Sequence, residues 1–337
     1  MKPIAERVRE AEERIRAHIR RTPLVRSETL SAASGRDVFL KLENLQVTGS
    51  FKVRGVLNKL LSLTDDERSR GVITASTGNH GLATAHAADL IGVAATIVLP
   101  ETADPAKVDR LRERGVRIEL RGAECAEAES WARSEGQRRG ALYVPPYNDL
   151  DVIAGQGTVG LEVAQELGRV DEFFASVGGG GLIAGAAGFL VESGAGTKAT
   201  GCLPKNSPVM YDSMKAGRIV ESPIFPTLSD STAGGIEPGA ITFELCRRFV
   251  SGWVLVEEAE IREAMALIHE EHDLVVEGAA GVAVAGLRKS RRSGARGQTA
   301  VVVVCGGNVA PAVFEEAVGR APRGGDESGG DGRFRHG

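Results

Sequence analysis

Short runs of β-branched residues alternate with helical segments along most of this chain, and no other feature limits the fold as much. The runs that predict strands are residues 37–42, 71–75, 94–99, 117–120, 142–144, 172–177, 198–202 and 300–304. The segments that predict helices are residues 3–20, 50–63, 81–91, 106–114, 123–135, 155–167, 181–191, 258–271 and 278–289. Strand–helix–strand units favour parallel sheets covered by helices, so the sequence predicts an α/β protein. Its 337 residues suffice for two domains.

Charge and cysteine usage exclude several classes of function. The formal net charge of −4 does not favour a nucleic-acid partner or an anionic membrane surface. Residues 1–21 lack the apolar core of a signal peptide, and apolar runs such as residues 300–305 are too short to span a bilayer. Four cysteines without CxxC spacing are typical of reduced thiols. We therefore expect a cytoplasmic protein that acts on a small molecule.

The segment Thr48-Gly49-Ser50-Phe51-Lys52 places a lysine at the predicted start of a helix. The positive end of the helix dipole disfavours a cation there. Such a position suits an amine that must react in its neutral form, because burial and the helix end both lower its pKa. Taken alone, a lysine is more often a solvated surface residue. Lys52 is therefore a candidate nucleophile that needs support from other motifs.

Two loops precede predicted helices and could bind anions. The first, Ser76-Thr77-Gly78-Asn79-His80, combines backbone N–H groups with side-chain donors and could hold a carboxylate, although ordinary helix capping explains it equally well. The second, Gly178-Gly179-Gly180-Gly181, could wrap a phosphate. It also matches a dinucleotide-binding fingerprint, but the following strand, residues 198–202, does not end in the acidic residue that a ribose requires.

A third position follows the last predicted strand. Cys305 comes directly after residues 300–304 and precedes Gly306-Gly307-Asn308. A cysteine here is most often simply buried, but ligands of α/β proteins gather at the carboxyl ends of strands.

Taken together, these motifs resemble the fold-type II pyridoxal-phosphate (PLP) enzymes, which have a tryptophan synthase beta-like fold, and within them the threonine and serine dehydratases (ammonia-lyases) and the related serine racemases. The resemblance also covers Arg21-Thr22-Pro23-Leu24, Ala154-Gly155-Gln156-Gly157-Thr158 and Glu277-Gly278-Ala279-Ala280. It implies a large cofactor-binding domain (residues 1–67 and 148–320), a small mobile domain (68–147) and a homodimer or higher homo-oligomer. Residues 321–337 lack apolar periodicity, which predicts a disordered tail.

The resemblance also implies roles for individual residues. Lys52 would form a Schiff base with PLP and remove the substrate's α-proton, so that the β-hydroxyl leaves and a 2-oxo acid and ammonia result. The other cofactor-binding residues would be Phe51 behind the ring, Asn79 at the ring hydroxyl, Gly178, Gly179, Gly180 and Gly181 around the phosphate, and Cys305 at the ring nitrogen. Residues Ser76, Thr77, Gly78, Asn79 and His80, together with Tyr147, would bind the substrate.

The sequence departs from the family pattern at a few positions. Thr77 stands where serine racemases have a catalytic serine, which argues against racemisation. Leu203 stands where relatives with a divalent cation have an acidic ligand, so we expect no metal site. Segment 230–238 is unusual and is a candidate wall of the substrate pocket. The substrate stays open between threonine or serine and relatives such as hydroxyaspartate, phenylserine or a hydroxyectoine-pathway compound, and a racemase is a further alternative.

Overall fold

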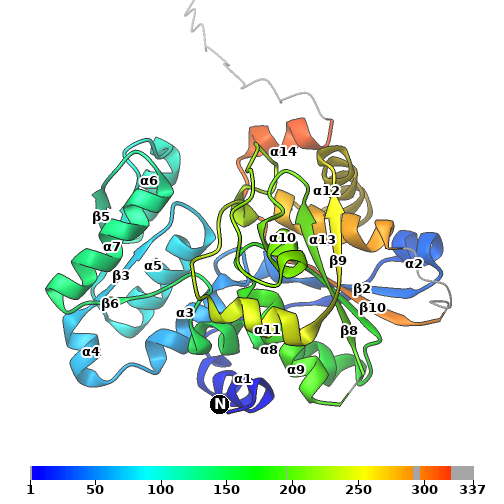
Figure 1. Ribbon diagram of the computed structural model, residues 1–337, viewed down its shortest axis with the longest axis horizontal. Helices are drawn as coiled ribbons and strands as arrows, with labels where there is room; N and C mark the ends of the chain where they lie inside the picture. Colours follow the sequence, from blue (N-terminus) through cyan, green and yellow to red (C-terminus); the bar gives the residue numbers. More distant parts are fainter. Residues whose placement is uncertain (1, 195, 291–296, 320–337) are drawn as a thin grey trace, which may run out of the picture.

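The part of the chain that the structure describes contains two separate β-sheets (Figure 1). The computed structural model describes residues 2–194, 196–290 and 297–319, so the predicted tail, 321–337, lies outside the described residues. The larger sheet has the order β1-β2-β10-β7-β8-β9 and the smaller has the order β5-β4-β3-β6. Strands β1 and β2 pair antiparallel, and the other pairs are parallel. The predicted α/β class, with mostly parallel sheets flanked by helices, is confirmed.

The strands agree closely with the predicted runs. Their bounds are β1 Leu24–Arg26, β2 Asp37–Leu42, β3 Val72–Ala75, β4 Ala95–Leu99, β5 Arg117–Leu120, β6 Leu142–Tyr143, β7 Glu172–Ser176, β8 Lys198–Pro204, β9 Val250–Val256 and β10 Thr299–Val304. Strand β10 is buried from Ala300 onward and lies between β2 and β7. A run of consecutive valines suits this position because a central parallel strand is covered on both faces.

Helices connect and cover the strands. They are α1 Ile4–Ile15, α2 Glu28–Ser34, α3 Lys52–Leu61, α4 Asp65–Arg70, α5 Asn79–Ile91, α6 Pro105–Arg112, α7 Cys125–Arg139, α8 Leu150–Leu167, α9 Gly181–Glu192, α10 Val209–Ala216, α11 Ile241–Phe249, α12 Glu258–His272, α13 Gly278–Lys289 and α14 Pro311–Ala317. Short 3-10 turns lie at Glu43–Leu45 and Asp230–Thr232. Helix α8 begins five residues earlier than predicted, because Asp149 accepts hydrogen bonds from the first backbone N–H groups of the helix.

The smaller sheet is covered on both faces. Ile97 packs with residues of α5 and α6, whereas Val98 packs with residues of α7. Because consecutive strand residues point to opposite faces, α5 and α6 cover one face and α7 covers the other. All four strands of this sheet fall within residues 72–143. That residues 68–147 move as a unit relative to 1–67 and 148–320 stays a prediction.

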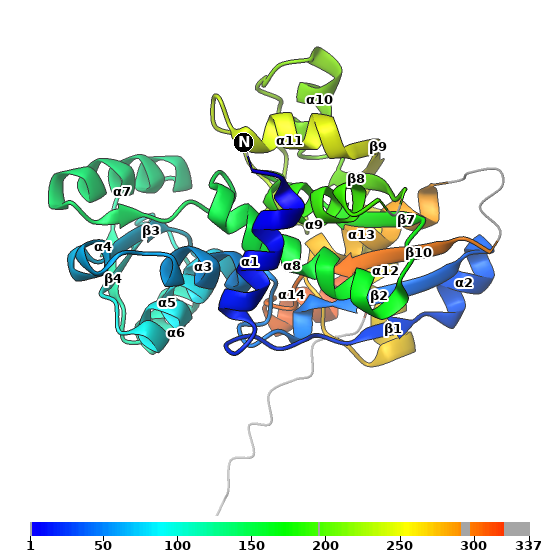
Figure 2. The ribbon, with the colours of Figure 1, turned by 90° about the horizontal axis from the view of Figure 1, so that it is seen from below.

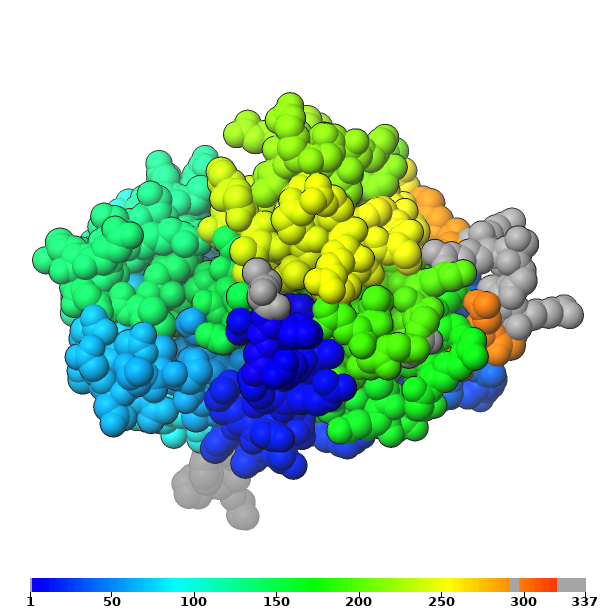
Figure 3. Space-filling model, turned by 60° about the horizontal axis from the view of Figure 1, so that its bottom comes forward, coloured from blue at the N-terminus to red at the C-terminus, as the bar shows by residue number. Residues whose placement is uncertain are grey.

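The larger sheet carries the main hydrophobic core. Helix α9 contacts β7, β8 and β9, and α13 contacts β7 to β10. Seen from below, α1 lies across α8 and α9 (Figure 2). The space-filling view shows the N-terminal helix between the chain segments of the smaller sheet and those of the larger one (Figure 3). The parallel pairing of β7 and β10 brings their carboxyl ends side by side, and the candidate site lies at those ends.

Candidate active site

A pocket lies where chain segments from both sheets meet. It is lined by Phe51, Lys52, Asn79, Glu124, Cys125, Ala126, Glu129, Pro146, Tyr147, Ser176, Gly178, Gly179, Gly180, Gly181, Leu182, Ile224, Ser231, Thr232, Ala233, Gly234, Gly235, Glu277, Ala279 and Cys305. The larger sheet contributes the residues after β7 and β10, and the smaller sheet contributes the starts of α5 and α7. The pocket therefore brings together the motifs that the sequence analysis selected separately.

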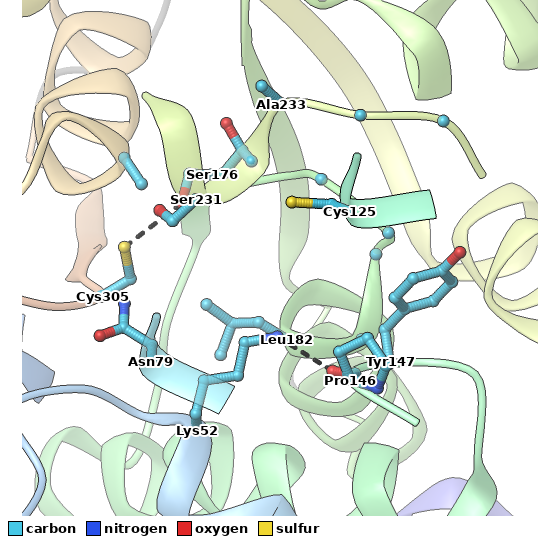
Figure 4. Close-up of a pocket in the computed structure, with 18 of the residues that line it drawn as sticks. Lys52, Asn79, Cys125, Pro146, Tyr147, Ser176, Leu182, Ser231, Ala233 and Cys305 are labelled. Atoms are coloured by element: carbon cyan, nitrogen blue, oxygen red, sulfur yellow. Dashed lines mark hydrogen bonds between the residues drawn. The ribbon is translucent and has the colours of Figure 1, made fainter. Parts of the chain in front are cut away.

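Lys52 is the first residue of α3, which begins two residues after the predicted start. Its Nζ donates a hydrogen bond of 2.9 Å to the carbonyl of Pro146 and lies 5.3 Å from the centre of the Phe51 ring (Figure 4). Burial lowers the pKa of the Lys52 amine to about 8, against smaller opposing effects of Glu277 and Cys305. A neutral amine is therefore accessible near neutral pH, as a carbonyl-attacking nucleophile requires.

The glycine run forms a tight loop between β7 and α9. Gly180 has φ of +86°, in the left-handed region that favours glycine. A Cβ at Gly178 would lie 3.0 Å from backbone atoms of Thr232, and a Cβ at Gly179 would lie 2.3 Å from the ring of Tyr147. Side chains would thus fill the space in front of the α9 N-terminus, where backbone N–H groups and the helix dipole attract anions. The loop fits the phosphate group of PLP.

Cys305 and Ser176 meet at the ends of β10 and β7. Cys305 is 1% exposed, and its Sγ accepts a hydrogen bond from Ser176 Oγ at 3.5 Å. Sγ also lies 3.6 Å from Glu277 Oε1, to which it donates. Burial, reinforced by Glu277, raises the pKa of the Cys305 thiol well above its usual value. The pocket therefore presents a neutral thiol, as expected for a weak partner of a ring nitrogen.

Glu277 is a site residue that the sequence analysis did not single out. It accepts hydrogen bonds from Asn79 Nδ2 at 2.7 Å and from Ser231 Oγ at 3.2 Å. Burial raises the pKa of its carboxyl group. A Cβ at Gly306 would lie 2.8 Å from this carboxyl, so glycine leaves room for it. In the sequence, Glu277 directly precedes a predicted helix. Acidic residues are favourable there because of the helix dipole, so the position alone gave no sign of a role in the site.

The predicted substrate-binding loop contributes one side chain to the pocket lining. Asn79 lines the pocket. The other residues of the loop do not line it: Ser76, Thr77, Gly78 and His80. His80 is 3% exposed, its Nε2 lies 3.0 Å from the carbonyl of Val144, and burial lowers the pKa of its imidazole to about 3. Roles for these four residues stay predictions.

Tyr147 and the segment after residue 230 form another wall of the pocket. The Tyr147 hydroxyl accepts a hydrogen bond from the backbone N–H of Glu237 at 3.0 Å, and burial raises its pKa to about 12. Residues 231–235 line the pocket, as proposed from the unusual sequence of this segment. The start of α7, with Glu124, Cys125 and Glu129, was not predicted to reach the site. Only the three-dimensional arrangement of the two parts of the molecule brings the start of α7 to the pocket.

We expect activity to survive exhaustive chelation of divalent cations. Leu203 is 1% exposed within β8, at the position where an acidic ligand was considered. Within residues 2–194, 196–290 and 297–319, no group of three or more His, Cys, Asp or Glu side chains could hold a metal ion. The measurement is the turnover rate before and after chelation. A large loss that magnesium or manganese restores would contradict the prediction.

Comparisons with known proteins identify the class to which this fold and pocket belong. Residues 15–306 match the family described as pyridoxal-phosphate dependent enzymes, and the chain belongs to this family. It is 42% identical over 302 residues to the L-threonine ammonia-lyase of Geobacter sulfurreducens, covering 90% of this chain and 75% of the relative. It is thus a PLP-dependent enzyme, and Lys52, the glycine loop and Cys305 provide a setting that fits this cofactor.

Solved structures agree with this assignment. Processed threonine deaminase isoform 2 from Solanum lycopersicum is similar with a TM-score of 0.89 and 30% identity, covering 94% of this chain and 87% of that one. Maize serine racemase is similar with a TM-score of 0.87 and 30% identity, covering 93% and 96%. Among the described residues, no helix is both long and apolar enough to cross a membrane.

Proposed function

We propose that this enzyme eliminates the β-hydroxyl of L-threonine or L-serine and so forms a 2-oxo acid and ammonia. The observation that carries the proposal is the position of the Lys52 amine between the glycine loop and Cys305 in one pocket. The ammonia-lyase relative and the threonine deaminase structure support this reaction. The family assignment argues against the dinucleotide interpretation of the glycine run.

PLP, when bound, supplies a carbonyl that condenses with amines and a ring that withdraws electrons from the substrate's Cα. Gly178 to Gly181 hold its phosphate through backbone N–H groups at the start of α9. Phe51 would lie behind the ring, Asn79 would bind the ring hydroxyl and Cys305 would bind the ring nitrogen.

Lys52 then acts as the base. Its Nζ accepts the α-proton, and its pKa of about 8 keeps the neutral form accessible near neutral pH. The β-hydroxyl takes up a proton and leaves as water, and the enamine product then reacts with water to give the 2-oxo acid and ammonia. A neutral thiol at Cys305 pairs weakly with the ring nitrogen, which favours prompt loss of the hydroxyl over return of the proton to Cα.

The pocket lining favours a neutral substrate side chain. Of the described residues that line it, Lys52 alone is a cation, whereas Glu124, Glu129 and Glu277 are carboxyl groups. A substrate with a second carboxylate, such as 3-hydroxyaspartate, would therefore lack a pairing partner. Phenylserine and a hydroxyectoine-pathway compound stay alternatives, as does racemisation, which Thr77 disfavours and the serine racemase likeness keeps open.

A panel of β-hydroxy amino acids tests the proposal. We expect threonine or serine to give the highest rate of 2-oxo acid formation and 3-hydroxyaspartate to give at least about tenfold less. The same reactions are assayed for the D-amino acid. Formation of a D-amino acid faster than the 2-oxo acid would favour the racemase, and a preference for 3-hydroxyaspartate would contradict the argument from charge.

Further parts of the proposal concern the setting of the enzyme. A cytoplasmic location is supported by Cys125, Cys202, Cys246 and Cys305, all of which are free thiols. A homodimer is proposed from the family resemblance, and light scattering would measure the mass of the assembly in solution.

We also propose that residues 68–147 close over the pocket when substrate binds, since α5 and α7 supply part of its lining.

A further inference from the structure

A chain of side-chain hydrogen bonds runs from the surface of α6 to the pocket. Arg110 Nη2 donates to Asn308 Oδ1 at 2.7 Å. Asn308 Nδ2 donates to Asn79 Oδ1 at 2.6 Å, and Asn79 Nδ2 donates to Glu277 at 2.7 Å. Arg110 belongs to the segment proposed to move, whereas Asn308 follows β10 in the larger sheet. The chain of contacts therefore joins the two parts of the molecule at the cofactor site.

The two ends of Asn308 cannot be exchanged. Its Nδ2 also donates to the carbonyl of Thr48 at 2.8 Å, and a carbonyl can only accept. Its Oδ1 faces a guanidinium, which can only donate. If the amide were turned around, its nitrogen would face the guanidinium donor, and its oxygen would face the oxygen acceptors of Thr48 and Asn79. A Cβ at Gly49, whose φ is +74°, would lie 2.7 Å from Asn308 Oδ1, so the backbone leaves this space for the amide.

The fixed orientation passes to Asn79. Since Asn308 offers an N–H, the Asn79 oxygen must face it, and the Asn79 nitrogen must face Glu277 and the pocket. One hydrogen on Nδ2 binds Glu277. Among the residues that the structure describes, no acceptor takes the other hydrogen, and Asn79 lines the pocket. Asn79 thus presents a donor to a ligand.

We propose that Arg110 is a positioning residue, which acts through Asn308 so that Asn79 offers an N–H to the ring hydroxyl of PLP. The inference rests on the proposed contact of Asn79 with that hydroxyl. It also gives movement of α6 an effect on cofactor recognition, because withdrawal of the guanidinium removes one of the contacts that fix the orientation of the Asn308 amide. Arg110 is exposed and outside the pocket lining, so its effect has to pass through the two amides.

The test compares PLP with 3-deoxypyridoxal 5′-phosphate, which lacks the ring hydroxyl. Both are titrated into the full chain after its own cofactor has been removed. We expect Arg110→Leu to weaken PLP binding by about fivefold, the loss typical of one hydrogen bond, and to leave binding of the 3-deoxy analogue unchanged. Arg112→Leu is the control, because Arg112 lies on the same helix and, among the described residues, pairs with its neighbour Asp109 alone.

Asn308→Asp provides a second variant. A carboxylate in place of the amide nitrogen repels the Asn79 oxygen, so Asn79 turns and offers its oxygen to the pocket. We expect this variant to lose most of the preference for PLP over the analogue. The inference is overturned if Arg110→Leu weakens binding of both ligands equally, or if it changes the binding of neither. Failure of the unsubstituted chain to bind PLP would instead contradict the proposed function, so the two failures are distinguishable.

Discussion

Lys52→Ala is expected to reduce the rate of 2-oxo acid formation by about a thousandfold or more. The substitution removes both the amine that links the cofactor and the base that accepts the α-proton, and each role contributes a large factor. Lys52 is the first residue of α3, and its Nζ contacts the carbonyl of Pro146 at the pocket. The measurement is steady-state formation of the 2-oxo acid, without added amines that could replace the side chain.

Lys59→Ala is the matched control for this variant. Lys59 lies on the same helix but pairs with Asp149 at 2.8 Å, away from the pocket lining. We expect it to retain most of the activity. Borohydride reduction of the holoenzyme should fix the cofactor to the peptide that contains Lys52, and this label should be absent from Lys52→Ala. Near-normal turnover by Lys52→Ala would show that another group is the base.

The sequence predicted the regular elements that have a strong pattern. The valine run before Cys305 and the alternation from residue 71 to residue 202 gave strands within one or two residues of those observed. Lys52 at a helix start and the glycine loop before α9 were also predicted correctly as structural positions. These features depend on local periodicity and on glycine, both of which a sequence displays directly.

Other elements were missed because their stability comes from tertiary packing. Among the described strands, β9 pairs with β8 alone at the edge of the larger sheet, and Ser251 and Gly252 interrupt its apolar residues. Helices α10 and α11 flank the segment 218–240, which is rich in proline and glycine. Such segments predict loops, and the helices on either side are only 8 and 9 residues long, which gives a periodic pattern little room to show.

The polar contacts of the site could not be predicted for a similar reason. Glu277 meets Asn79 and Cys305, which lie 198 and 28 residues away in the sequence. Neither spacing corresponds to a helix or strand period. Only the pairing of β10 beside β7, together with the position of the α5 start next to their carboxyl ends, brings these three side chains together. The sequence showed which groups could do chemistry but not which of them are neighbours.

Substitutions of Cys305 should separate a neutral partner of the ring nitrogen from a charged one. Serine also provides a neutral, weakly hydrogen-bonding group beside Ser176, so Cys305→Ser should change the barrier by only about 1 kcal/mol. Aspartate differs in kind, because a carboxylate favours a protonated ring nitrogen through charge pairing. We then expect elimination to slow by about a hundredfold, while the α-proton returns to Cα more often.

The neighbouring carboxyl group of Glu277 makes the aspartate variant more informative. Cys305 Sγ lies 3.6 Å from Glu277 Oε1, so the new carboxyl would be next to a buried acid whose pKa is already raised. Two carboxyl groups this close tend to share one proton, which limits the charge available to the ring. Adding Glu277→Gln to Cys305→Asp removes the competing acid and should strengthen the effect on α-proton return.

Two measurements decide the outcome for these variants. The first is the rate of 2-oxo acid formation, and the second is deuterium incorporation at Cα of the recovered substrate in deuterated water. We expect Cys305→Ser to resemble the unsubstituted enzyme in both, and Cys305→Asp to form less 2-oxo acid while incorporating more deuterium. If Cys305→Ser is inactive, or if Cys305→Asp is unchanged in both measurements, Cys305 does not face the ring nitrogen. The thiol would then serve only to fill the space between β7 and β10, where Ser176 and Glu277 already surround it.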